Sequence, residues 1–411
     1  MTHTEPLELR LSSRPVLALV GAEVVSGLGS YMTFLALPWF VLVTTGSPTR
    51  MGIVLAAELL PVALLGIPSG TVVTRLGART TMLVCDLARA PIVAAIPLLH
   101  AAELLSFPLF VGLVALTGVF SGPYFSSQRL ILPELLGEDE RTIARANSIV
   151  EGAQRLNAFL GPALAGVLIA AMGASNVLYL DAATFLASAL ILAGFVTRRP
   201  PVAADEDSGG MLAGLRFVLR DSFLGPIMIT VVVSNMLGQA TIAALPVLAY
   251  EDFGESARVA GAFFAAMGVG AVLGSFAAFG IVGRFSPLHV ATFAVLAGTV
   301  PRWFLGLDLH EAGIVVVLAA SSFWNPVGNV VMISLMTVRT PPALRAKVMT
   351  AVITFATIAG PIGLVLAGPA LAAFGAQSVF LAIAAGMTVS ALWFAAVALR
   401  NGPRSAVVVP A

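Results

Sequence analysis

Several long stretches of this sequence contain no Asp, Glu, Lys or Arg, and they constrain its fold more than any other feature. They include residues 104–128, 156–180, 222–250, 259–283, 312–338 and 348–399. A helix that crosses the hydrocarbon core of a bilayer needs roughly 20 apolar residues, so each stretch is long enough to cross. The last stretch is more than twice that length and must turn once. Gly375, followed by the polar Gln377 and Ser378, is the expected place for the turn.

The overall composition is that of a membrane protein. Of the 411 residues, 58% are hydrophobic and 10% are charged, whereas soluble domains carry about 25% charged residues. One span and a short loop take about 34 residues, so the chain has room for about twelve crossings. We therefore expect an all-α membrane protein with twelve transmembrane helices, near residues 15–43, 51–74, 80–99, 104–127, 146–172, 175–197, 222–249, 258–282, 286–307, 312–337, 347–373 and 377–399.

Basic residues indicate how these spans are oriented. With the N-terminus in the cytoplasm, 17 of the 22 Lys and Arg residues fall in cytoplasmic loops or tails, and three fall in outer loops, namely Arg50, Arg258 and Arg302. Positive residues accumulate on the cytoplasmic side of membrane proteins. The sequence therefore predicts a multi-pass protein of the cytoplasmic (inner) membrane with both termini in the cytoplasm. The first apolar run continues to Val43, so we interpret it as a span and not as a cleaved signal peptide.

The two halves of the chain resemble each other when one is shifted along the other. A shift of 208 residues aligns 36–38 with 244–246, Gly46 with Gly254 and Arg50 with Arg258, and a shift of 202 aligns Gly161 with Gly363 and Gly173 with Gly375. Two nearly equal shifts at corresponding points predict a parallel repeat, an arrangement known in transporters with a substrate site near the membrane midplane.

The longest polar stretch lies between the sixth and seventh spans and divides these halves. We expect an N-terminal six-helix bundle at 1–197, a cytoplasmic linker at 198–221 and a C-terminal six-helix bundle at 222–411. Within the linker, the segment Met211–Arg220 mixes Leu and Phe with two arginines. This pattern is typical of a short amphipathic helix that lies in the membrane interface.

The loop between the second and third spans carries Gly70, Arg75, Gly77 and Arg79. Their spacing resembles the cytoplasmic loop motif of the major facilitator superfamily, although Thr74 stands where the family has the Asp of a charge latch. The chain is identified as a member of that superfamily over nearly its whole length. The resemblance implies two six-helix bundles in pseudo-twofold parallel repeat, and a gating role for these four loop residues.

Further segments are similar to one branch of the superfamily. In the fifth span, Gly161, Pro162 and Gly166 resemble the Gly-Pro segment of its drug and proton antiporters, which implies a part in gating for Gly161 and Pro162. Residues 36–42 and 180–186 look most like the bacterial enterobactin-exporter and macrolide-efflux branch. The resemblance implies an exporter that is driven by protons.

Two acidic residues lie well inside predicted spans. Glu23 is about one third of the way into the first span, and Glu58 is about one third of the way into the second from the opposite surface. An ionisable side chain at the centre of a span costs about 2.5–3.5 kcal/mol, so each needs a reason to be there. One reason is proton coupling, because burial favours the protonated carboxyl until the site opens. The other is a neutral carboxyl that only bonds a neighbouring helix.

Polar and aromatic side chains in four spans form a candidate substrate site. The family resemblance implies that spans 1, 4, 7 and 10 line a central cavity. Amides can hydrogen-bond a ligand without the cost of a charge, and aromatic rings supply an apolar wall. The alternative is that the amides only join helices to one another. The candidates are Gly27, Ser30, Tyr31 and Phe34 in span 1, Tyr124 in span 4, Asn235 and Gln239 in span 7, and Phe323, Trp324, Asn325 and Asn329 in span 10.

Charged pairs inside spans are further candidates for gating. Asp86 and Arg89 in the third span resemble the Asp-x-x-Arg that often follows the family's loop motif. Glu151 and Arg155 in the fifth span are spaced i, i+4 in the order that favours a helical ion pair. They either gate the transporter or only neutralise each other. We interpret Asp181, near the outer end of the sixth span, as structural.

Several classes of function are excluded by what the sequence lacks. The only lysine, Lys347, does not follow a glycine, so no phosphate-binding loop is present. A single cysteine and four scattered histidines offer no metal cluster and no catalytic triad. The net charge of +1 leaves no basic arm for nucleic acid. We therefore expect neither an enzyme nor a bound cofactor.

The leading hypothesis is a secondary active exporter that acts as a monomer in the lipid bilayer. It would exchange protons for a small amphipathic or hydrophobic substrate, such as a drug-like molecule, an antibiotic or a siderophore, by alternating access. An importer or facilitator with the same fold is the first alternative. A membrane scaffold or sensor that transports nothing is the second.

Overall fold

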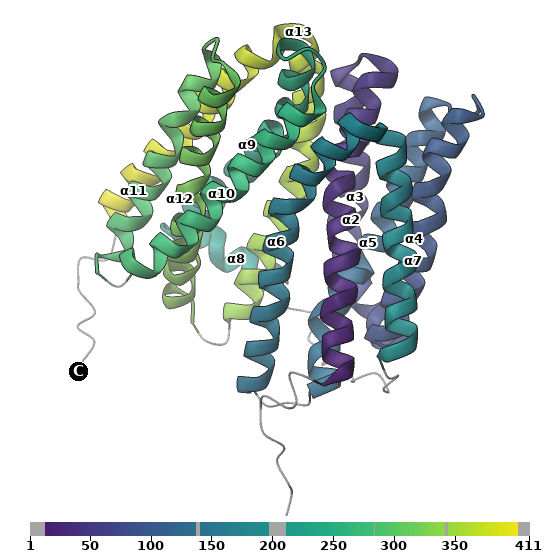
Figure 1. Cartoon of the computed structure of the whole chain (residues 1–411). Coiled ribbons are helices and arrows are strands. Elements are labelled where there is room, and N and C mark those ends of the chain that lie inside the picture. Colours follow the sequence, from purple (N-terminus) through teal and green to yellow (C-terminus); the bar gives the residue numbers. More distant parts are fainter. Residues whose placement is uncertain (1–12, 137–139, 197–210, 283, 342–343, 402–411) are drawn as a thin grey trace, which may run out of the picture. The chain divides into compact units, whose positions relative to one another are not determined.

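The computed structural model describes residues 13–136, 140–196, 211–282, 284–341 and 344–401. All elements named in these ranges are helices (Figure 1). In chain order they are α2 (Arg14–Thr45), α3 (Pro48–Leu76), α4 (Ala78–Ala101), α5 (Phe107–Leu136), α6 (Glu140–Met172), α7 (Ala174–Phe195), α8 (Met211–Arg220), α9 (Leu224–Asp252), α10 (Ala257–Ile281), α11 (Pro287–Thr299), the 3₁₀ helix η1 (Pro301–Gly306), α12 (Glu311–Arg339) and α13 (Arg345–Asn401).

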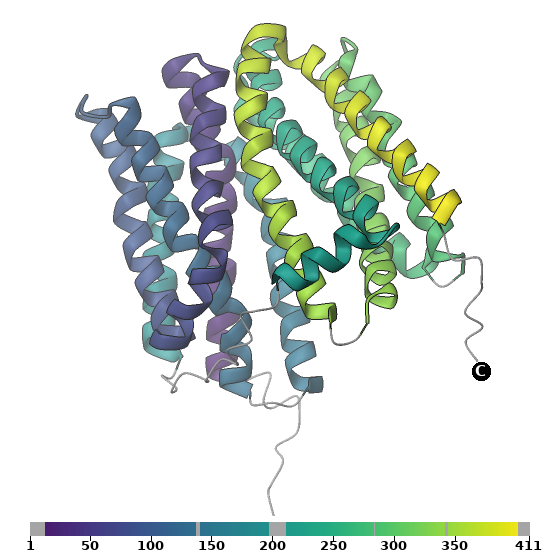
Figure 2. The same cartoon turned by 180° about the vertical axis from the view of Figure 1, so that it is seen from behind.

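Helix lengths confirm the predicted membrane fold. Within the described ranges, eleven helical segments are long and apolar enough to cross a bilayer. The last of them, Lys347–Arg400, has 54 residues and holds two crossings, because Gly375 adopts φ 74° and ψ 167° and breaks it. Figure 2 shows α13 as two rods joined at a sharp bend. The described ranges therefore hold twelve spans, and the predicted turn at Gly375 is confirmed.

Glycines that correspond under the two sequence shifts share the same backbone conformation. Gly46 and Gly254 have φ values of 60° and 61°, and each follows the end of a helix. Gly173 and Gly375 have φ values of 84° and 74°. Positive φ is a conformation that glycine adopts without steric cost. The repeat seen in the sequence is thus reproduced at two helix junctions in each half.

The contacts divide the chain into two compact units. The N-terminal unit is Met1–Glu206 with Leu245–Ala265, and the C-terminal unit is Asp207–Ala244 with Ala266–Ala411. The N-terminal unit thus includes the end of α9 and the start of α10. In it, α2 packs against α6 and α7, and α4 packs against α5 and α7 (Figure 1). Its core includes Leu19, Met82, Leu132 and Leu192.

The C-terminal unit is built on α11, α12 and α13, where α11 packs against both α12 and α13, and α8 lies against α13. The amphipathic helix begins and ends where the sequence predicted, with Val218 buried in the core and Arg216 and Arg220 exposed. Asp221 then caps α9, because its carboxylate accepts hydrogen bonds from the amides of Phe223 and Leu224 at 2.8 and 2.9 Å. The linker residues 198–210 lie outside the described ranges.

The ninth span differs from the expected single α-helix. It consists of α11 followed by η1, and the change of helix type falls at Pro301, which cannot donate a backbone hydrogen bond. The assignment of Arg302 to an outer loop was wrong, because this residue lies inside η1, in the last turns of the span Pro287–Gly306.

Candidate functional site

Among the side chains that the structure describes, the membrane spans of the N-terminal unit bury four charged ones. They are Glu23 on α2, Asp86 and Arg89 on α4, and Asp181 on α7, with exposed fractions of 4%, 0%, 4% and 1%. Ionisable side chains inside a membrane are costly and face the interior of a bundle or a water-filled cavity. We refer to these four residues as the carboxyl cluster.

Two glutamines in succession fix the position of the Glu23 side chain. One carboxylate oxygen accepts a short hydrogen bond from the Gln128 side-chain amide on α5. The Gln128 carbonyl in turn accepts a hydrogen bond of 3.3 Å from Gln154 on α6, which fixes the orientation of the Gln128 amide. The other oxygen of Glu23 is buried and has no hydrogen-bond partner among the described residues. One side of this carboxyl is therefore satisfied and the other is open.

Asp86 and Arg89 form an ion pair one helical turn apart on α4, at 2.6 Å. Ser188 on α7 donates a hydrogen bond of 2.7 Å to the second oxygen of Asp86. The guanidinium of Arg89 lies over the rings of Tyr124 and Phe185, 4.3 and 4.2 Å from their centroids. Cation–π contacts of this kind stabilise a desolvated guanidinium. The pair lies deep in the span and not at the loop where the family resemblance places its gating motif.

Asp181 joins α7 to α2. Its carboxylate accepts a hydrogen bond of 2.6 Å from the Thr33 hydroxyl, and Thr184 donates to its other oxygen at 3.3 Å. Asp181, Thr184 and Ser188 follow one another at spacings of three and four residues, so they share one face of α7. Gly29 permits this close approach, because a Cβ atom there would overlap the side chains of Thr184 and Asp181.

The carboxyl cluster has more acidic groups than basic ones. Arg89 compensates Asp86, whereas the hydrogen bonds of Glu23 and Asp181 come from neutral amide and hydroxyl groups. The charges of Asp86 and Arg89 act on both Glu23 and Asp181, so the four groups form one electrostatic unit. Two neighbouring carboxyl groups in a low-dielectric site cannot both lose their protons without a large cost in free energy. The cluster is therefore suited to hold and exchange protons.

Glu58 on α3 lies at the Asp181 end of the carboxyl cluster. Its side chain is partly buried, and Asp181 is the charged group that acts on it. The backbone carbonyl of Glu58 lies against α5 at Gly118, where a Cβ atom would overlap it. Thr33 and Glu23 lie ten residues apart, which is about 15 Å along α2. Carboxyls thus extend over about half the thickness of the hydrocarbon core.

Unpartnered polar atoms concentrate in this cluster. Four buried side-chain atoms have no hydrogen-bond partner within the described parts of the chain, and three belong to Glu23, Arg89 and Tyr124. The fourth is the carbonyl oxygen of Gln239. Buried polar atoms without partners are rare in folded proteins and often mark functional sites. In the same described ranges, no group of three His, Cys, Asp or Glu residues could hold a metal ion.

The predicted substrate face of α2 lies beside the cluster. Gly27, Ser30, Tyr31 and Phe34 are all partly buried, and Phe34 stacks edge-on against Phe264 at 5.8 Å. Gly27 has a packing role, because a Cβ atom there would meet the buried side chain of Asn157 on α6. The Asn157 amide donates to the backbone carbonyls of Glu23 and Val24 at 3.4 and 3.2 Å. Asn157 thereby fixes α6 against α2 next to the cluster.

The loop motif between α3 and α4 contains one residue with a clear structural role. The Arg79 guanidinium donates hydrogen bonds of 3.2 and 2.9 Å to the backbone carbonyls of Leu192 and Ala193 in the last turn of α7. A cation there satisfies carbonyls that have no partner within the helix. Gly77 adopts φ 80° at the start of α4, whereas Gly70 is partly buried and Arg75 is exposed. The gating role of these residues stays a prediction.

The candidates on α6 separate into surface and contact residues. Glu151 and Arg155 are both exposed, and the choice between gating and mutual neutralisation stays open for this pair. Gly161 packs against the backbone of α2, where a Cβ atom would overlap Tyr31. Pro162 lies one turn before Gly166, and the Pro162 carbonyl and Gly166 both touch Gly261 of α10.

The candidates in the C-terminal unit lie on α9 and α12. Asn235, Asn325 and Asn329 are exposed on the surface of this unit, and Gln239 is partly buried against Gly360 of α13. Trp324 stacks edge-on with Phe323 at 5.0 Å and with Phe293 at 5.1 Å. Tyr124, the remaining aromatic candidate, belongs to the core of the N-terminal unit and faces Arg89.

Sequence reasoning missed the polar partners of the cluster. Thr33, Gln128 and Ser188 were not singled out, whereas the interpretation of Asp181 as structural stays a prediction. The acidic side chain of Asp181 inside a span was itself a signal. Ser188 follows it at a spacing of seven residues, which places both on one helix face. The neutral donors Thr33 and Gln128 carry no comparable signal, because hydroxyls and amides are common in membrane helices.

A bundle of twelve apolar helices that buries a carboxyl cluster in one unit is the architecture of a secondary membrane transporter. The chain belongs to the major facilitator superfamily, whose family model matches residues 19–364. It is accordingly a transporter and not an enzyme.

Two named relatives are similar over most of the chain. The multidrug efflux pump Tap of Mycolicibacterium fortuitum is 29% identical over 385 residues, which cover 90% of this chain and 92% of Tap. Tap of Mycobacterium tuberculosis is 27% identical over 402 residues, with 92% of each chain covered. The enterobactin exporter EntS of Shigella flexneri is 26% identical over 249 residues, or 57% of this chain and 56% of EntS.

Solved structures share the fold at low sequence identity. The nucleoside transporter NupG superimposes with a TM-score of 0.74 at 14% identity, covering 93% of this chain and 98% of NupG. A POT family transporter superimposes with a TM-score of 0.73 at 12% identity, covering 94% and 96%. These likenesses establish the fold of the major facilitator superfamily for this chain.

Proposed function

We propose that this protein is an exporter of the cytoplasmic membrane that exchanges protons for a small amphipathic or hydrophobic compound by alternating access. The observation that carries the proposal is the excess of carboxyls inside the N-terminal unit. Glu23 and Asp181 are buried with only neutral hydrogen-bond donors, while the single guanidinium of the cluster is paired with Asp86. A buried carboxyl without a counter-charge is stable when it carries a proton.

Glu23 and Glu58 are the proposed coupling residues, with Asp181 between them. Glu23 has a free carboxylate oxygen that can take up or release a proton. Asp181 is linked electrostatically to the Asp86–Arg89 pair on one side and to Glu58 on the other. Loss of a proton would place a negative charge in a low-dielectric site and favour the conformation that admits water to it. Release of the proton thereby shifts the equilibrium between the two access states.

The direction of transport and the class of substrate rest on the relatives. Tap is named a multidrug efflux pump, and its likeness covers nine tenths of this chain. The exposed amides Asn235 and Asn325 and the rings of Phe323 and Trp324 offer adaptable hydrogen bonds beside an apolar wall. Such surfaces suit amphipathic compounds better than strongly polar ones. The excess of basic residues in alternate loops supports cytoplasmic placement of both termini.

Everted membrane vesicles test direction and coupling together. With an acidic interior, an exporter accumulates a cationic dye such as ethidium inside the vesicles, whereas an importer does not. The double variant Glu23→Gln with Glu58→Gln should abolish this accumulation. Glu251→Gln, which changes an exposed acid at the end of α9, should leave it unchanged. Gradient-driven uptake that persists in the double variant would show that neither carboxyl couples transport to protons.

A further inference from the structure

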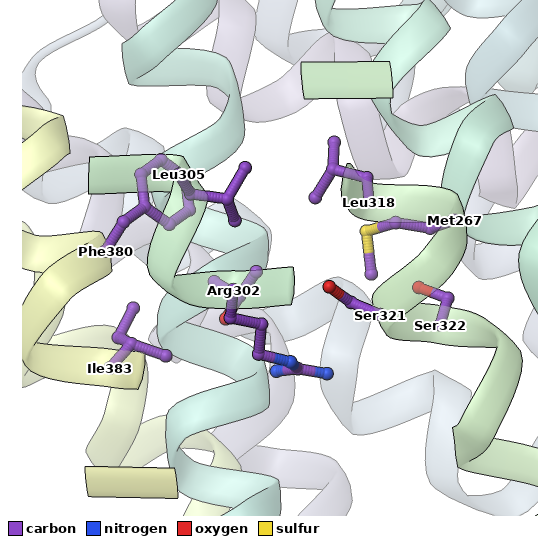
Figure 3. Close-up of a pocket in the computed structure, with 9 residues that line it drawn as sticks. Met267, Arg302, Leu305, Leu318, Ser321, Ser322, Phe380 and Ile383 are labelled. Carbon is purple, nitrogen blue, oxygen red and sulfur yellow. The ribbon is translucent and has the colours of Figure 1, made fainter. Parts of the chain in front are cut away.

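The C-terminal unit encloses a cavity around an arginine for which the proton-coupled mechanism has no use. Arg302 lies in η1, and Ser321 and Ser322 on α12 line the same cavity, together with Thr241 and Met267 (Figure 3). The remaining walls are apolar side chains of η1, α12 and α13. The centre of a water-sized particle can move within about 10 Å³ of this cavity, so the cavity holds about one such particle.

The guanidinium of Arg302 turns toward the inside of the unit. An arginine near the end of a span normally extends toward the membrane surface. Here the Arg302 Nε donates a hydrogen bond of 3.1 Å to the carbonyl of Gly298, which precedes it by one turn. Figure 3 shows the side chain extending from η1 toward α12, on the side of Ser321. The Arg302 guanidinium therefore points into the bundle, although the residue lies near the end of its span.

The protein groups around Arg302 do not compensate its charge. Its second described hydrogen bond, of 2.6 Å, goes from one terminal nitrogen to the sulfur of Met387, a weak acceptor. A guanidinium has five donors, so most of them lack a partner among the described residues. An arginine remains charged in proteins, so loss of a proton cannot relieve the cost of burial.

The acids in the spans of the C-terminal half lie at the span ends, where Glu251 and Asp252 end α9 and Glu311 begins α12. The stretches 222–250, 259–283, 312–338 and 348–399 lack Asp and Glu, and so does 285–307. The cavity walls likewise contain none. This is the reverse of the carboxyl cluster, whose three carboxyls outnumber its one arginine. A partly buried charge whose cavity walls carry no counter-charge can take one from a ligand.

We propose that Arg302, with Ser321 and Ser322, binds a monovalent anionic group in this cavity. The size of the cavity admits a chloride ion or one oxygen of a carboxylate, and the free guanidinium donors fit either. Ser321 donates its own proton to the Val317 carbonyl at 2.7 Å, so the guanidinium and Ser322 are the donors for the anion. A carboxylate would belong to a transported compound, and chloride would be a resident ion.

A purely structural role is the competing explanation. η1 is joined to α13 by a second bond, because the Trp303 ring nitrogen donates to the Thr388 hydroxyl at 3.0 Å. Trp303 can thus hold η1 in place without Arg302. A structural arginine would make stability independent of the anion in the buffer, whereas an anion site makes it depend on which anion is present.

The test is thermal unfolding of the purified, full-length protein in lipid nanodiscs. At constant ionic strength, a bulky sulfonate without a carboxylate, such as sodium MES, is replaced stepwise by sodium chloride, sodium acetate or sodium benzoate. We expect a saturable rise in Tm with at least one of the small anions. Arg302→Gln should weaken the apparent anion affinity by about tenfold or more, because charge-assisted hydrogen bonds are lost. Arg284→Gln, which removes an exposed arginine of the same unit, should respond like the unaltered protein.

The anions that raise Tm distinguish a resident chloride ion from the carboxylate of a transported compound. A rise with chloride alone identifies a resident ion, and a rise with acetate and benzoate identifies a site for carboxylate-bearing compounds.

If Arg302→Gln does not fold, Arg302→Lys and Ser322→Ala keep the charge and should show weaker but measurable anion dependence. An unaltered protein whose Tm is the same in all four salts overturns the proposal. Equal responses of the Arg302 and Arg284 variants overturn it as well. The readout does not involve protons or transport, so failure here leaves proton-coupled export untouched.

Discussion

Glu23 on α2 accepts a hydrogen bond from Gln128 on α5 with one carboxylate oxygen, and the other is buried without a partner in the part of the chain that the structure describes. The two residues lie 105 positions apart in the chain, so this contact ties the first span to the fourth. Gln128 is oriented from behind by Gln154 on α6. The contact therefore presents a carboxyl that is held in place on one side and free to exchange a proton on the other.

Glu23→Gln should uncouple transport without unfolding the protein. Glutamine has nearly the same shape and retains an acceptor for the Gln128 amide, but it cannot release a proton. Coupling free energies between linked sites commonly correspond to 5–150-fold changes in affinity, so we expect gradient-driven efflux to fall by about that factor. Efflux of a preloaded dye from energised cells measures it, with Glu251→Gln as the control. A variant that pumps normally would remove Glu23 from the coupling mechanism.

Variants of Asp181 and Thr33 should show whether Asp181 contributes to stability, to proton coupling or to both. Thr33→Val removes the hydroxyl that donates to the buried carboxylate at 2.6 Å. Hydrogen bonds between membrane helices contribute about 0.6–1.7 kcal/mol, so we expect the free energy of unfolding to fall by about that amount. Asp181→Asn retains an acceptor for Thr33 and should cost less, while reducing proton-driven transport. Unfolding by SDS titration, paired with vesicle transport, measures both effects. Equal stability loss in the two variants, with intact transport, would leave Asp181 as a structural residue.

The Asp86–Arg89 ion pair predicts a strongly non-additive double mutant. Asp86→Asn leaves the Arg89 guanidinium buried with two aromatic rings but without its carboxylate. Breaking a buried pair in this way typically costs about 3–5 kcal/mol. Asp86→Leu combined with Arg89→Met removes both charges and should be less destabilising than either single change. A double-mutant cycle on the purified protein measures the coupling. Additive effects would mean that the two charges do not stabilise each other.

The fold could be predicted from the sequence because it depends on long, regular patterns. Uncharged stretches set the number of spans, and the glycines at 375, 46 and 254 mark junctions where only the backbone conformation matters. Bilayer thickness converts length into topology with little ambiguity. The break of the ninth span into α11 and η1 was not predicted, because it depends on how a single proline is accommodated locally.

The candidate site could be predicted only in part. Glu23 and Glu58 were found because an acid inside a span is conspicuous in any sequence. The electrostatic coupling of Glu23 and Asp181 to Asp86 and Arg89 depends on which faces of α2, α4 and α7 pack together, which hydropathy does not encode. Arg302 was misplaced for a related reason. A charge near a predicted boundary is assigned to the loop, and only the hydrogen bond to Gly298 shows that it turns inward.

The contact of Gly166 with Gly261 yields the last prediction. These glycines bring α6 and α10 together so closely that a Cβ atom on Gly166 would lie 2.7 Å from the Ala257 carbonyl and 2.8 Å from the Gly261 Cα. Gly166→Ala therefore requires the two backbones to move apart, and overpacking of this kind costs about 1–3 kcal/mol. We expect a lower Tm and slower transport, because helices that approach over glycines can slide where larger side chains interlock.

Gly152→Ala is the matched control for this prediction. Gly152 lies on the same helix, and a Cβ atom there meets nothing within 4 Å. Alanine is favoured over glycine in a helix by about 0.8–1.0 kcal/mol, so this variant should be as stable as the unaltered protein or slightly more stable. Thermal unfolding and dye efflux, measured on both variants side by side, decide the matter. If Gly166→Ala behaves like Gly152→Ala in both measurements, close packing of α6 on α10 is not required for transport.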